Sequence, residues 1–189
     1  MRQKPDVLAR AIVARSRLFT VEELQLRFAN GVERTYERLV NRGLGYGAVM
    51  VVALEADGEH VLLIEEYCAG IDAYERSLPK GLIEPGEDVL AAANRELKEE
   101  AGFGARRLEH ITGLSLSPGY MSQSIQVVLA RDLYAERLPG DEPEEIRVSR
   151  ISLRNLAELA LSASFSEGRA LAALYLVRDL LTQRGEYQP

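Results

Sequence analysis

The sequence predicts an α/β protein in which helices flank a mixed β-sheet. Many strand-like segments follow one another along the chain, with only a few helical segments among them, and this order is typical of a mixed sheet covered by helices. The two strand-like runs of the segment 47–67 are nearly all apolar, as expected for strands that are covered on both faces. The chain has 189 residues, of which 47% are hydrophobic, enough to bury one good core.

The first predicted element is a β-hairpin over residues 18–40. Two strand-like segments flank Asn30-Gly31, and Asn-Gly is a strong hairpin signal. The segment 47–67 repeats the pattern around Asp57-Gly58. We therefore expect two hairpins in the first third of the chain.

A helix is predicted next, over about residues 88–101. Pro85-Gly86 form a turn before it, Glu87 or Asp88 can cap it, and Gly102 fits its C-terminal stop.

The remaining elements are two strands, an acidic loop, a short strand and a closing helix. The strands lie near residues 106–116 and 124–133, and the loop covers 138–146. Ser166 is the predicted cap of the closing helix, whose apolar residues recur at helical spacing over 170–181.

Composition and charge argue against several classes of protein. The net charge is −6 and the pI is about 5.1, which argues against a nucleic-acid binder because such a protein needs a positive surface. No segment approaches about 18 apolar residues, so neither a membrane span nor a secretory core is expected. Cys68 is the single cysteine and cannot form an internal disulfide, which favours a cytoplasmic location.

Three carboxylates collect on the predicted helix 88–101. Glu96, Glu99 and Glu100 lie three and four residues apart, at the edge of an apolar stripe, and each such like-charge pair costs a helix roughly 0.2–0.5 kcal/mol. An ordinary solvated charged face is one interpretation. The alternative is a site for Mg²⁺ or Mn²⁺, because hard oxygen ligands beside a tight turn are what these cations require.

The residues around these carboxylates resemble the signature of the Nudix hydrolases. The pattern G-x5-E-x7-R-E-U-x-E-E-x-G-U, in which U is a bulky aliphatic or similar residue, is matched at every position, and its seven fixed residues are Gly81, Glu87, Arg95, Glu96, Glu99, Glu100 and Gly102. Segments elsewhere resemble the ADP-ribose pyrophosphatase branch of the family. The resemblance implies an α/β/α sandwich with a mixed sheet, and metal-dependent hydrolysis of a diphosphate linked to another group.

The resemblance also assigns roles to the residues of the signature. It implies that Glu96 and Glu100 are the principal metal ligands and that the carbonyl of Lys80 is a further oxygen donor. Glu99 would complete the metal cluster, held by Arg95.

A general base is expected on the loop 138–146. Members of the branch place an acidic residue on a loop after the sheet, and Glu144 matches best among Glu142, Glu144 and Glu145. A solvated acidic turn is the alternative for this loop, and Glu99 is the competing base.

Substrate-binding residues follow from weaker similarities. The resemblance implies that Tyr36 stacks on adenine, that Arg38 or Arg42 reaches the phosphates, and that Pro118 marks ADP-ribose and ADP-sugar hydrolases. A strand aromatic and a loop proline can equally be structural. Cys68 stands where the branch has an arginine, which favours broader use of ADP-ribose, NADH and diadenosine oligophosphates.

The hairpin 18–40 is additional to a minimal Nudix domain. Residues 1–45 are therefore expected to form an N-terminal arm and 46–189 the Nudix hydrolase domain. Such an arm exchanges between subunits in the branch, so the resemblance implies a homodimer, with Tyr36 serving the partner's site. Two alternatives stay open: a house-cleaning nucleoside triphosphatase, and a non-catalytic nucleotide-binding regulator.

Overall fold

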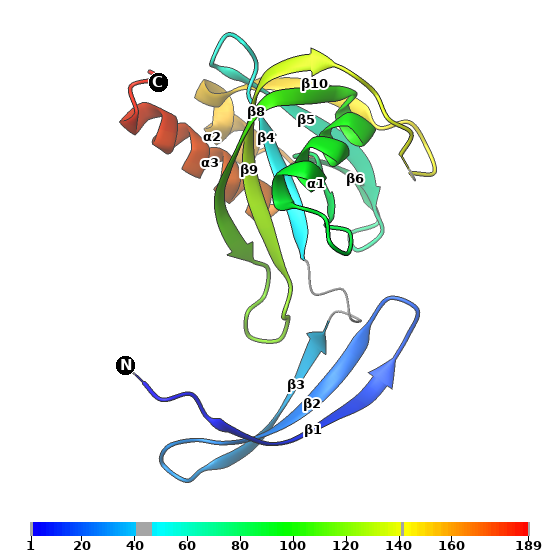
Figure 1. Ribbon diagram of the computed structural model, residues 1–189, viewed down its shortest axis with the longest axis vertical. Helices are drawn as coiled ribbons and strands as arrows, with labels where there is room; N and C mark the ends of the chain where they lie inside the picture. Colours follow the sequence, from blue (N-terminus) through cyan, green and yellow to red (C-terminus); the bar gives the residue numbers. More distant parts are fainter. Residues whose placement is uncertain (1, 41–46, 141, 189) are drawn as a thin grey trace. The chain divides into compact units, whose positions relative to one another are not determined.

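The computed structural model describes residues 2–40, 47–140 and 142–188 (Figure 1). The chain divides into two compact units, one made of residues 1–45 and 115–124 and the other of residues 46–114 and 125–189. Within the described residues, no helix is long and apolar enough to cross a membrane.

The first unit contains a three-stranded antiparallel sheet, and this corrects the predicted two-stranded arm. β2 (Thr20–Arg27) and β3 (Glu33–Val40) form the predicted hairpin, and β1 (Asp6–Arg15) pairs with the other edge of β2. The apolar residues of β1 do not alternate strictly with polar ones, so the pattern that identifies a half-buried strand is weak there.

The segment 115–124 belongs to this first unit through its backbone. The amide of Leu39 donates to the carbonyl of Tyr120 at 2.8 Å, and the amide of Ser122 donates to the carbonyl of Leu39 at 3.2 Å. The end of β3 is therefore bound to a segment that lies about 80 residues further along the chain.

The second unit contains two sheets. In the four-stranded sheet, β4 and β9 run parallel while β4 and β7 run antiparallel, so this sheet is mixed. The other sheet has three antiparallel strands. In spatial order the strands are β7 (Lys80–Leu82), β4 (Ala48–Ala53), β9 (Ser124–Ala135) and β8 (Phe103–Ser115), then β10 (Arg147–Ser152), β5 (His60–Cys68) and β6 (Ala73–Ser77).

The segment 47–67 does not form the predicted hairpin within one sheet. β4 and β5 belong to different sheets and share only the bridge between Leu54 and Val61. Both edges of β4 are already occupied, by β7 and by β9. The apolar sequence correctly indicated buried strands, but it could not show which strands pair.

Two apolar cores lie on opposite faces of β4. Met50 and Val52 belong to one core with α2 (Leu156–Ala160) and α3 (Gly168–Gln183). Val49 and Val51 belong to the other with α1 (Val89–Glu96). Successive strand residues point to opposite faces, so one strand supplies both cores. The arrangement of helices on both faces confirms the predicted α/β fold class (Figure 1).

The helix of the Nudix signature begins as predicted and ends in a wider turn. Asp88 caps it, with one carboxylate oxygen 2.8 Å from the amide of Leu90. From Leu97 to Ala101 the helix continues as a π-helix, η1, a form that is frequent at functional sites. It stops at Gly102, whose φ of 75° is the left-handed conformation of a helix end.

The cap of α3 is Glu167 rather than the predicted Ser166. The Glu167 carboxylate accepts from the amide of Ala170 at 2.8 Å. The amide of Ser166 instead donates to the buried carboxylate of Glu75 on β6. This contact with another element draws Ser166 away from the capping position, which the local sequence alone did not reveal. Before α3, the short 3-10 helix η2 (Leu153–Asn155) leads into α2.

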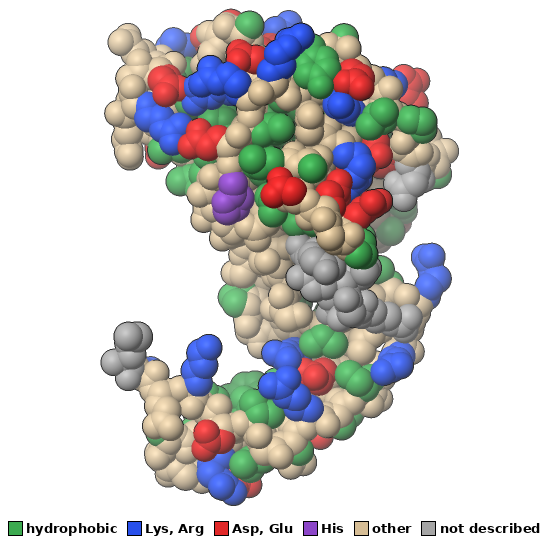
Figure 2. All heavy atoms as spheres, viewed as in Figure 1, with side chains coloured by type: hydrophobic (Ala, Val, Ile, Leu, Met, Phe, Trp, Pro, Cys, Tyr) green, Lys and Arg blue, Asp and Glu red, His purple; other side chains and the backbone are tan. Residues whose placement is uncertain are grey.

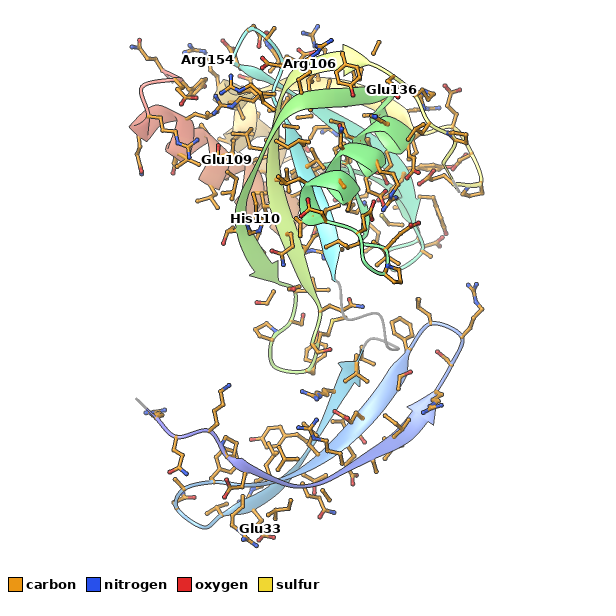
Figure 3. All side chains as sticks on the ribbon, in the orientation of Figure 1. Glu33, Arg106, Glu109, His110, Glu136 and Arg154 are labelled. Carbon is orange, nitrogen blue, oxygen red and sulfur yellow. The ribbon has the colours of Figure 1, made fainter. Side chains whose placement is uncertain are left out.

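Ion pairs on the surface of the second unit are separate from the Nudix signature. Lys, Arg, Asp and Glu side chains are scattered over the face of the molecule that Figure 2 shows. Arg184 pairs with Glu109 of β8 at 2.6 Å, and Arg154 pairs with Glu59 at 3.4 Å (Figure 3). Exposed pairs of this kind contribute about 0–1 kcal/mol each, so Glu109 is a suitable control position for the buried carboxylates described below.

Candidate active site

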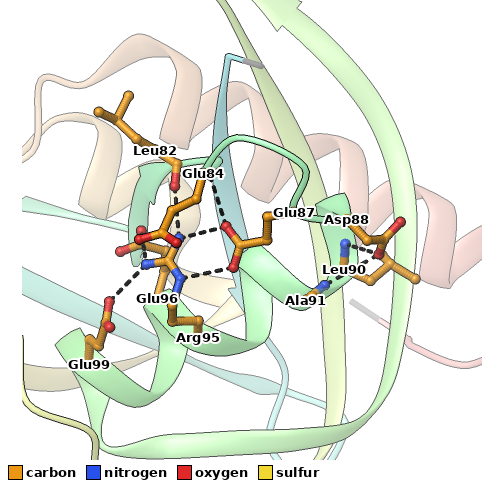
Figure 4. Close-up of polar contacts among 9 residues, drawn as sticks. All are labelled: Leu82, Glu84, Glu87, Asp88, Leu90, Ala91, Arg95, Glu96 and Glu99. Atoms are coloured by element: carbon orange, nitrogen blue, oxygen red, sulfur yellow. Dashed lines mark hydrogen bonds and ion pairs between the residues drawn. The ribbon is translucent and has the colours of Figure 1, made fainter. Parts of the chain in front are cut away.

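Arg95 on α1 connects the carboxylates of the Nudix signature (Figure 4). Its Nε and one terminal nitrogen donate to the two carboxylate oxygens of Glu87, both at 2.9 Å. Its other terminal nitrogen donates to Glu96 at 2.7 Å and to Glu99 at 3.0 Å. A guanidinium suits this role because its planar fork can hold several oxygens at fixed positions.

Glu87 ties the turn before α1 to Arg95. One of its carboxylate oxygens also accepts from the amide of Glu84 at 2.9 Å. Arg95 holds the pKa of Glu87 below its ordinary value, since the paired cation favours the charged carboxylate. Arg95 further donates to the carbonyl of Leu82 at 2.9 Å, so the strand end, the turn and the helix are joined by one side chain.

Glu96 is buried against the backbone of Gly81. Only 7% of Glu96 is exposed, and a Cβ atom at position 81 would lie 2.1–2.2 Å from its carboxylate atoms. Glycine is therefore the residue that lets β7 approach this carboxylate so closely. Burial raises the pKa of Glu96, while its bond to Arg95 acts in the opposite direction.

Glu100 is the most deeply buried carboxylate of the signature, with 3% exposed. One of its oxygens accepts from the amide of Lys80 at 2.7 Å. Burial raises the pKa of Glu100 to about 8, although Lys80 acts to lower it. The Lys80 ammonium forms its own ion pair with Glu66 on β5, so Glu100 lacks a cation of its own among the contacts of the described residues.

The residues present fit a bound divalent cation. Glu96 and Glu100 are buried carboxylates one turn apart, and each is harder to ionise because of its burial. A buried charge needs a partner of opposite sign or a metal, and carboxylate oxygens are the donors that Mg²⁺ and Mn²⁺ prefer. The backbone of Lys80 lies beside Glu100 through its amide contact.

A second group of possible metal ligands lies near the turn between β4 and β5. Among the described residues, ligand atoms of Glu55, Asp57 and His60 lie within 4.8 Å of one another. The carboxylates of Glu96, Glu99 and Glu100 are not arranged this closely. The residues of this second group already have protein partners, since Glu55 pairs with Arg150 and Asp57 accepts from the amide of His60. We therefore infer that they stabilise the turn between β4 and β5.

The acidic loop after β9 lies close to the Nudix signature. Tyr74 of β6 donates from its hydroxyl to Glu144 at 2.6 Å, and this bond raises the pKa of Tyr74. The charge of Glu142 contributes to the raised pKa of Glu96. Both glutamates line a pocket of about 330 Å³ formed by residues 65–67, 74 and 142–147. Sequence reasoning identified the acidic loop but not the tyrosines, which flank a hairpin loop in the segment "YCAGIDAY" (67–74).

The predicted substrate-binding residues lie in the first unit where they are described. Tyr36 on β3 is partly exposed and lies 6.3 Å from the ring of Phe28, and Arg38 pairs with Glu22 at 2.7 Å. Pro118 belongs to the segment 115–124 of the same unit. Arg42 and the expected domain boundary at 45–46 lie outside the described residues.

Cys68 ends β5 close to the signature. Its pKa is raised by burial and by the charge of Glu66. A cysteine side chain has no cationic form, so Cys68 cannot supply the positive charge of the arginine expected at this position.

Comparisons with known proteins match both parts of the chain. A model of the NudE-type Nudix hydrolase N-terminal domain matches residues 5–38, and a model of the NUDIX domain matches residues 46–174. The chain is 49% identical over 183 residues to the ADP compounds hydrolase NudE of Escherichia coli (strain K12), covering 97% of this chain and 96% of that protein.

Further relatives and a solved structure agree with these matches. An ADP-ribose pyrophosphatase of Bacillus subtilis (strain 168) is 29% identical over 130 residues, which cover 68% of this chain and 70% of that protein. A crystal structure of an ADP compounds hydrolase superposes with a TM-score of 0.90 at 48% identity, covering 99% of both chains.

Proposed function

The chain belongs to the Nudix hydrolase family, and on this basis we propose that it cleaves the diphosphate bond of ADP-containing compounds. The proposed substrates are ADP-ribose, NADH and diadenosine oligophosphates, and the products are AMP and a second phosphorylated compound. The observation that carries the proposal is the assembled signature, in which Arg95 holds Glu87, Glu96 and Glu99 while Glu100 is buried beside Lys80. The similarity to ADP compounds hydrolase NudE supports the choice of substrate class.

Mg²⁺ or Mn²⁺ is the proposed cofactor. Glu96 and Glu100 would be its principal ligands, Glu99 would complete the cluster, and the carbonyl of Lys80 would add a fourth oxygen. A bound divalent metal would supply positive charge beside the diphosphate and lower the pKa of a coordinated water. Arg95 would position Glu99 and Glu96 through its paired bonds, and Gly81 would leave the space that Glu96 occupies.

Glu144 is the proposed general base, with Glu99 as the competing candidate. The hydroxyl of Tyr74 fixes one oxygen of Glu144, which would leave the other free to accept a proton from water. A positioned base contributes about 10²–10⁴-fold in rate. If Glu144→Gln lowered kcat by less than tenfold while Glu99→Gln abolished it, Glu99 would be the base.

The first unit is proposed to be a dimerisation arm that completes the substrate site of a partner subunit. Its sheet exposes large apolar side chains on β1, namely Val7, Leu8, Ile12 and Val13, which are 41–48% exposed. Such a surface is typical of an interface. In the proposed homodimer Tyr36 stacks on adenine, Arg38 or Arg42 reaches the phosphates, and Pro118 borders the site.

A cytoplasmic location and the absence of nucleic-acid and membrane partners are part of the same proposal. The acidic net charge of −6 and the lone cysteine support them.

A panel of nucleotides tests the proposed activity. ADP-ribose, NADH, diadenosine triphosphate, GTP and dATP are each incubated with the protein and Mg²⁺, and the products are identified by chromatography. We expect AMP from the first three and no hydrolysis when a chelator replaces Mg²⁺. Loss of pyrophosphate from GTP or dATP, with the first three compounds intact, would identify a triphosphatase instead. Binding of these nucleotides without turnover of any would indicate a non-catalytic regulator.

A further inference from the structure

Two tyrosines stand opposite each other beside the turn of the β5–β6 hairpin. Tyr67 and Tyr74 are direct partners in the antiparallel register. Their rings meet edge to face, with centroids 5.7 Å apart and planes inclined by 68°. Tyr67 is 50% exposed and Tyr74 is 53% exposed, so each ring keeps surface in contact with solvent although the two rings pack together.

Both rings are held in place by their hydroxyl groups. Tyr67 donates to Asp72 at 2.5 Å, and Tyr74 donates to Glu144 at 2.6 Å. Asp72 itself has a φ of 53°, an uncommon conformation for a residue other than glycine. An exposed aromatic pair that is fixed in this way is preorganised to receive a flat ligand, because little side-chain freedom remains to be lost on binding.

These rings line the 330 Å³ pocket that also borders the acidic loop. A volume of this size lies in the range of small-molecule sites, and such sites combine aromatic walls with a few polar groups. We call it the tyrosine pocket. It lies entirely within the second unit.

The tyrosine pocket adjoins the buried carboxylates of the active site. Glu66, in its wall, forms an ion pair with Lys80, and the amide of Lys80 donates to Glu100. Glu66 is therefore linked to Glu100 through one residue, Lys80. In the proposed function, this link makes the pocket the candidate site for one end of a substrate whose diphosphate lies at the carboxylates.

The walls of the tyrosine pocket favour a ring over a phosphate group. Five of its ten lining residues are glutamates, and Arg147 is its one basic residue. Negative charge at this density repels a phosphate. An aromatic face, by contrast, stacks on the flat face of any base, whichever substituents that base carries.

We propose that the tyrosine pocket binds the planar ring on the non-adenylate side of the substrate: the nicotinamide of NADH or the second adenine of a diadenosine oligophosphate. This inference rests on the proposed function and adds to it a reason for accepting dinucleotides. ADP-ribose carries only a ribose on that side, with no planar ring, and gains nothing from stacking on the tyrosines.

Tyr67→Ala tests the proposal, because Tyr67 does not contact the candidate base Glu144 as Tyr74 does. We expect kcat/KM for NADH and for diadenosine triphosphate to fall about tenfold, as loss of one stacking contact implies. The value for ADP-ribose should change much less, by about twofold. Tyr67→Phe keeps the ring and should retain most of the efficiency toward NADH. Tyr175→Ala, on the distant helix α3, is a tyrosine control that should leave the ratio of the two efficiencies unchanged.

Binding of the separate half-products provides a second measurement. By calorimetry, Tyr67→Ala should weaken the binding of reduced nicotinamide mononucleotide about tenfold and leave that of ribose 5-phosphate unchanged. An equal loss of affinity for ribose 5-phosphate, which carries no planar ring, would overturn the proposal. Equal losses with NADH and ADP-ribose, or equal losses in Tyr67→Ala and Tyr67→Phe, would also overturn it. If the wild type hydrolysed none of the three compounds, the proposed function itself would fail.

Discussion

The N-terminal sheet and the Nudix signature fix their side chains to different degrees. In the sheet, β1 is exposed along its whole length, and Tyr36 is 44% exposed. In the signature, Glu96 and Glu100 are almost completely buried, and Arg95 makes bonds to three carboxylates.

This difference indicates which site is complete within one chain and which would depend on a partner. The geometry of the signature is determined within one chain, because burial and hydrogen bonds leave its side chains few alternatives. The exposed sheet has no comparable constraints, so its contribution to a site depends on what covers it. Three predictions test this contrast, from the largest expected effect to the smallest.

Replacing Glu100 should have the largest effect. Glu100→Gln keeps the size of the side chain but removes a buried anionic oxygen donor. We expect turnover to fall by at least about a thousandfold, roughly 4 kcal/mol, while circular dichroism stays that of the folded protein. Glu109→Gln, on the exposed face of β8 (Figure 3), is the matched control and should retain full activity. Activity of Glu100→Gln within threefold of the wild type at saturating Mg²⁺ would remove Glu100 from the metal site.

The stability of the metal-free protein should fall as pH rises through the window set by Glu100. The pKa of Glu100 is about 8 in the folded protein, against 4.5 for an ordinary glutamate side chain. Between these values the folded state binds more protons than the unfolded state, so each rise in pH disfavours folding, and the loss is complete above about pH 8. The expected loss is on the order of a few kcal/mol.

Denaturant unfolding from pH 5 to 9 in the presence of a chelator measures this effect. Glu100→Gln should lack this part of the pH dependence and be the more stable protein at pH 8.5. Added Mg²⁺ should restore the stability of the wild type. The opposite contribution of Glu87, whose pKa is lowered, is lost only as pH falls below about 4.5 and lies outside the window. A wild type and Glu100→Gln with parallel pH profiles would contradict the prediction.

Replacing Tyr36 tests the exposed sheet and should have the smallest effect of the three. Tyr36→Ala should raise KM about tenfold or somewhat more, because stacking on a base contributes roughly 1–3 kcal/mol. It should change kcat less, since the contact is present in both the ground state and the transition state.

Mixing Tyr36→Ala with Glu100→Gln then tests whether the site is shared between subunits. After subunit exchange, a mixed dimer would contain one site with both residues intact and should regain part of the activity. A monomer by light scattering, or no recovery after exchange has been verified, would reject the cross-subunit site.

The sequence was most informative where local rules act alone. The spacing of the signature, the Asp88 cap and the Gly102 stop each depend on neighbouring residues, and the structure agrees with them. It was least informative where partners are distant in the chain. Three contacts join residues more than 65 positions apart: the pairing of β4 with β9, the bond from the Ser166 amide to Glu75, and the Tyr74–Glu144 bond. No periodicity in the sequence predicts such contacts.

The backbone bonds of Leu39 have a consequence for any attempt to shorten this protein. The first unit contains the segment 115–124 as well as residues 1–45, so it is connected to the second unit at three points of the chain. Deleting residues 1–45 would leave the carbonyl of Tyr120 and the amide of Ser122 without their partner strand. The N-terminal region therefore cannot be removed without breaking backbone hydrogen bonds of the segment 115–124. A truncated protein would need a redesigned β8–β9 connection.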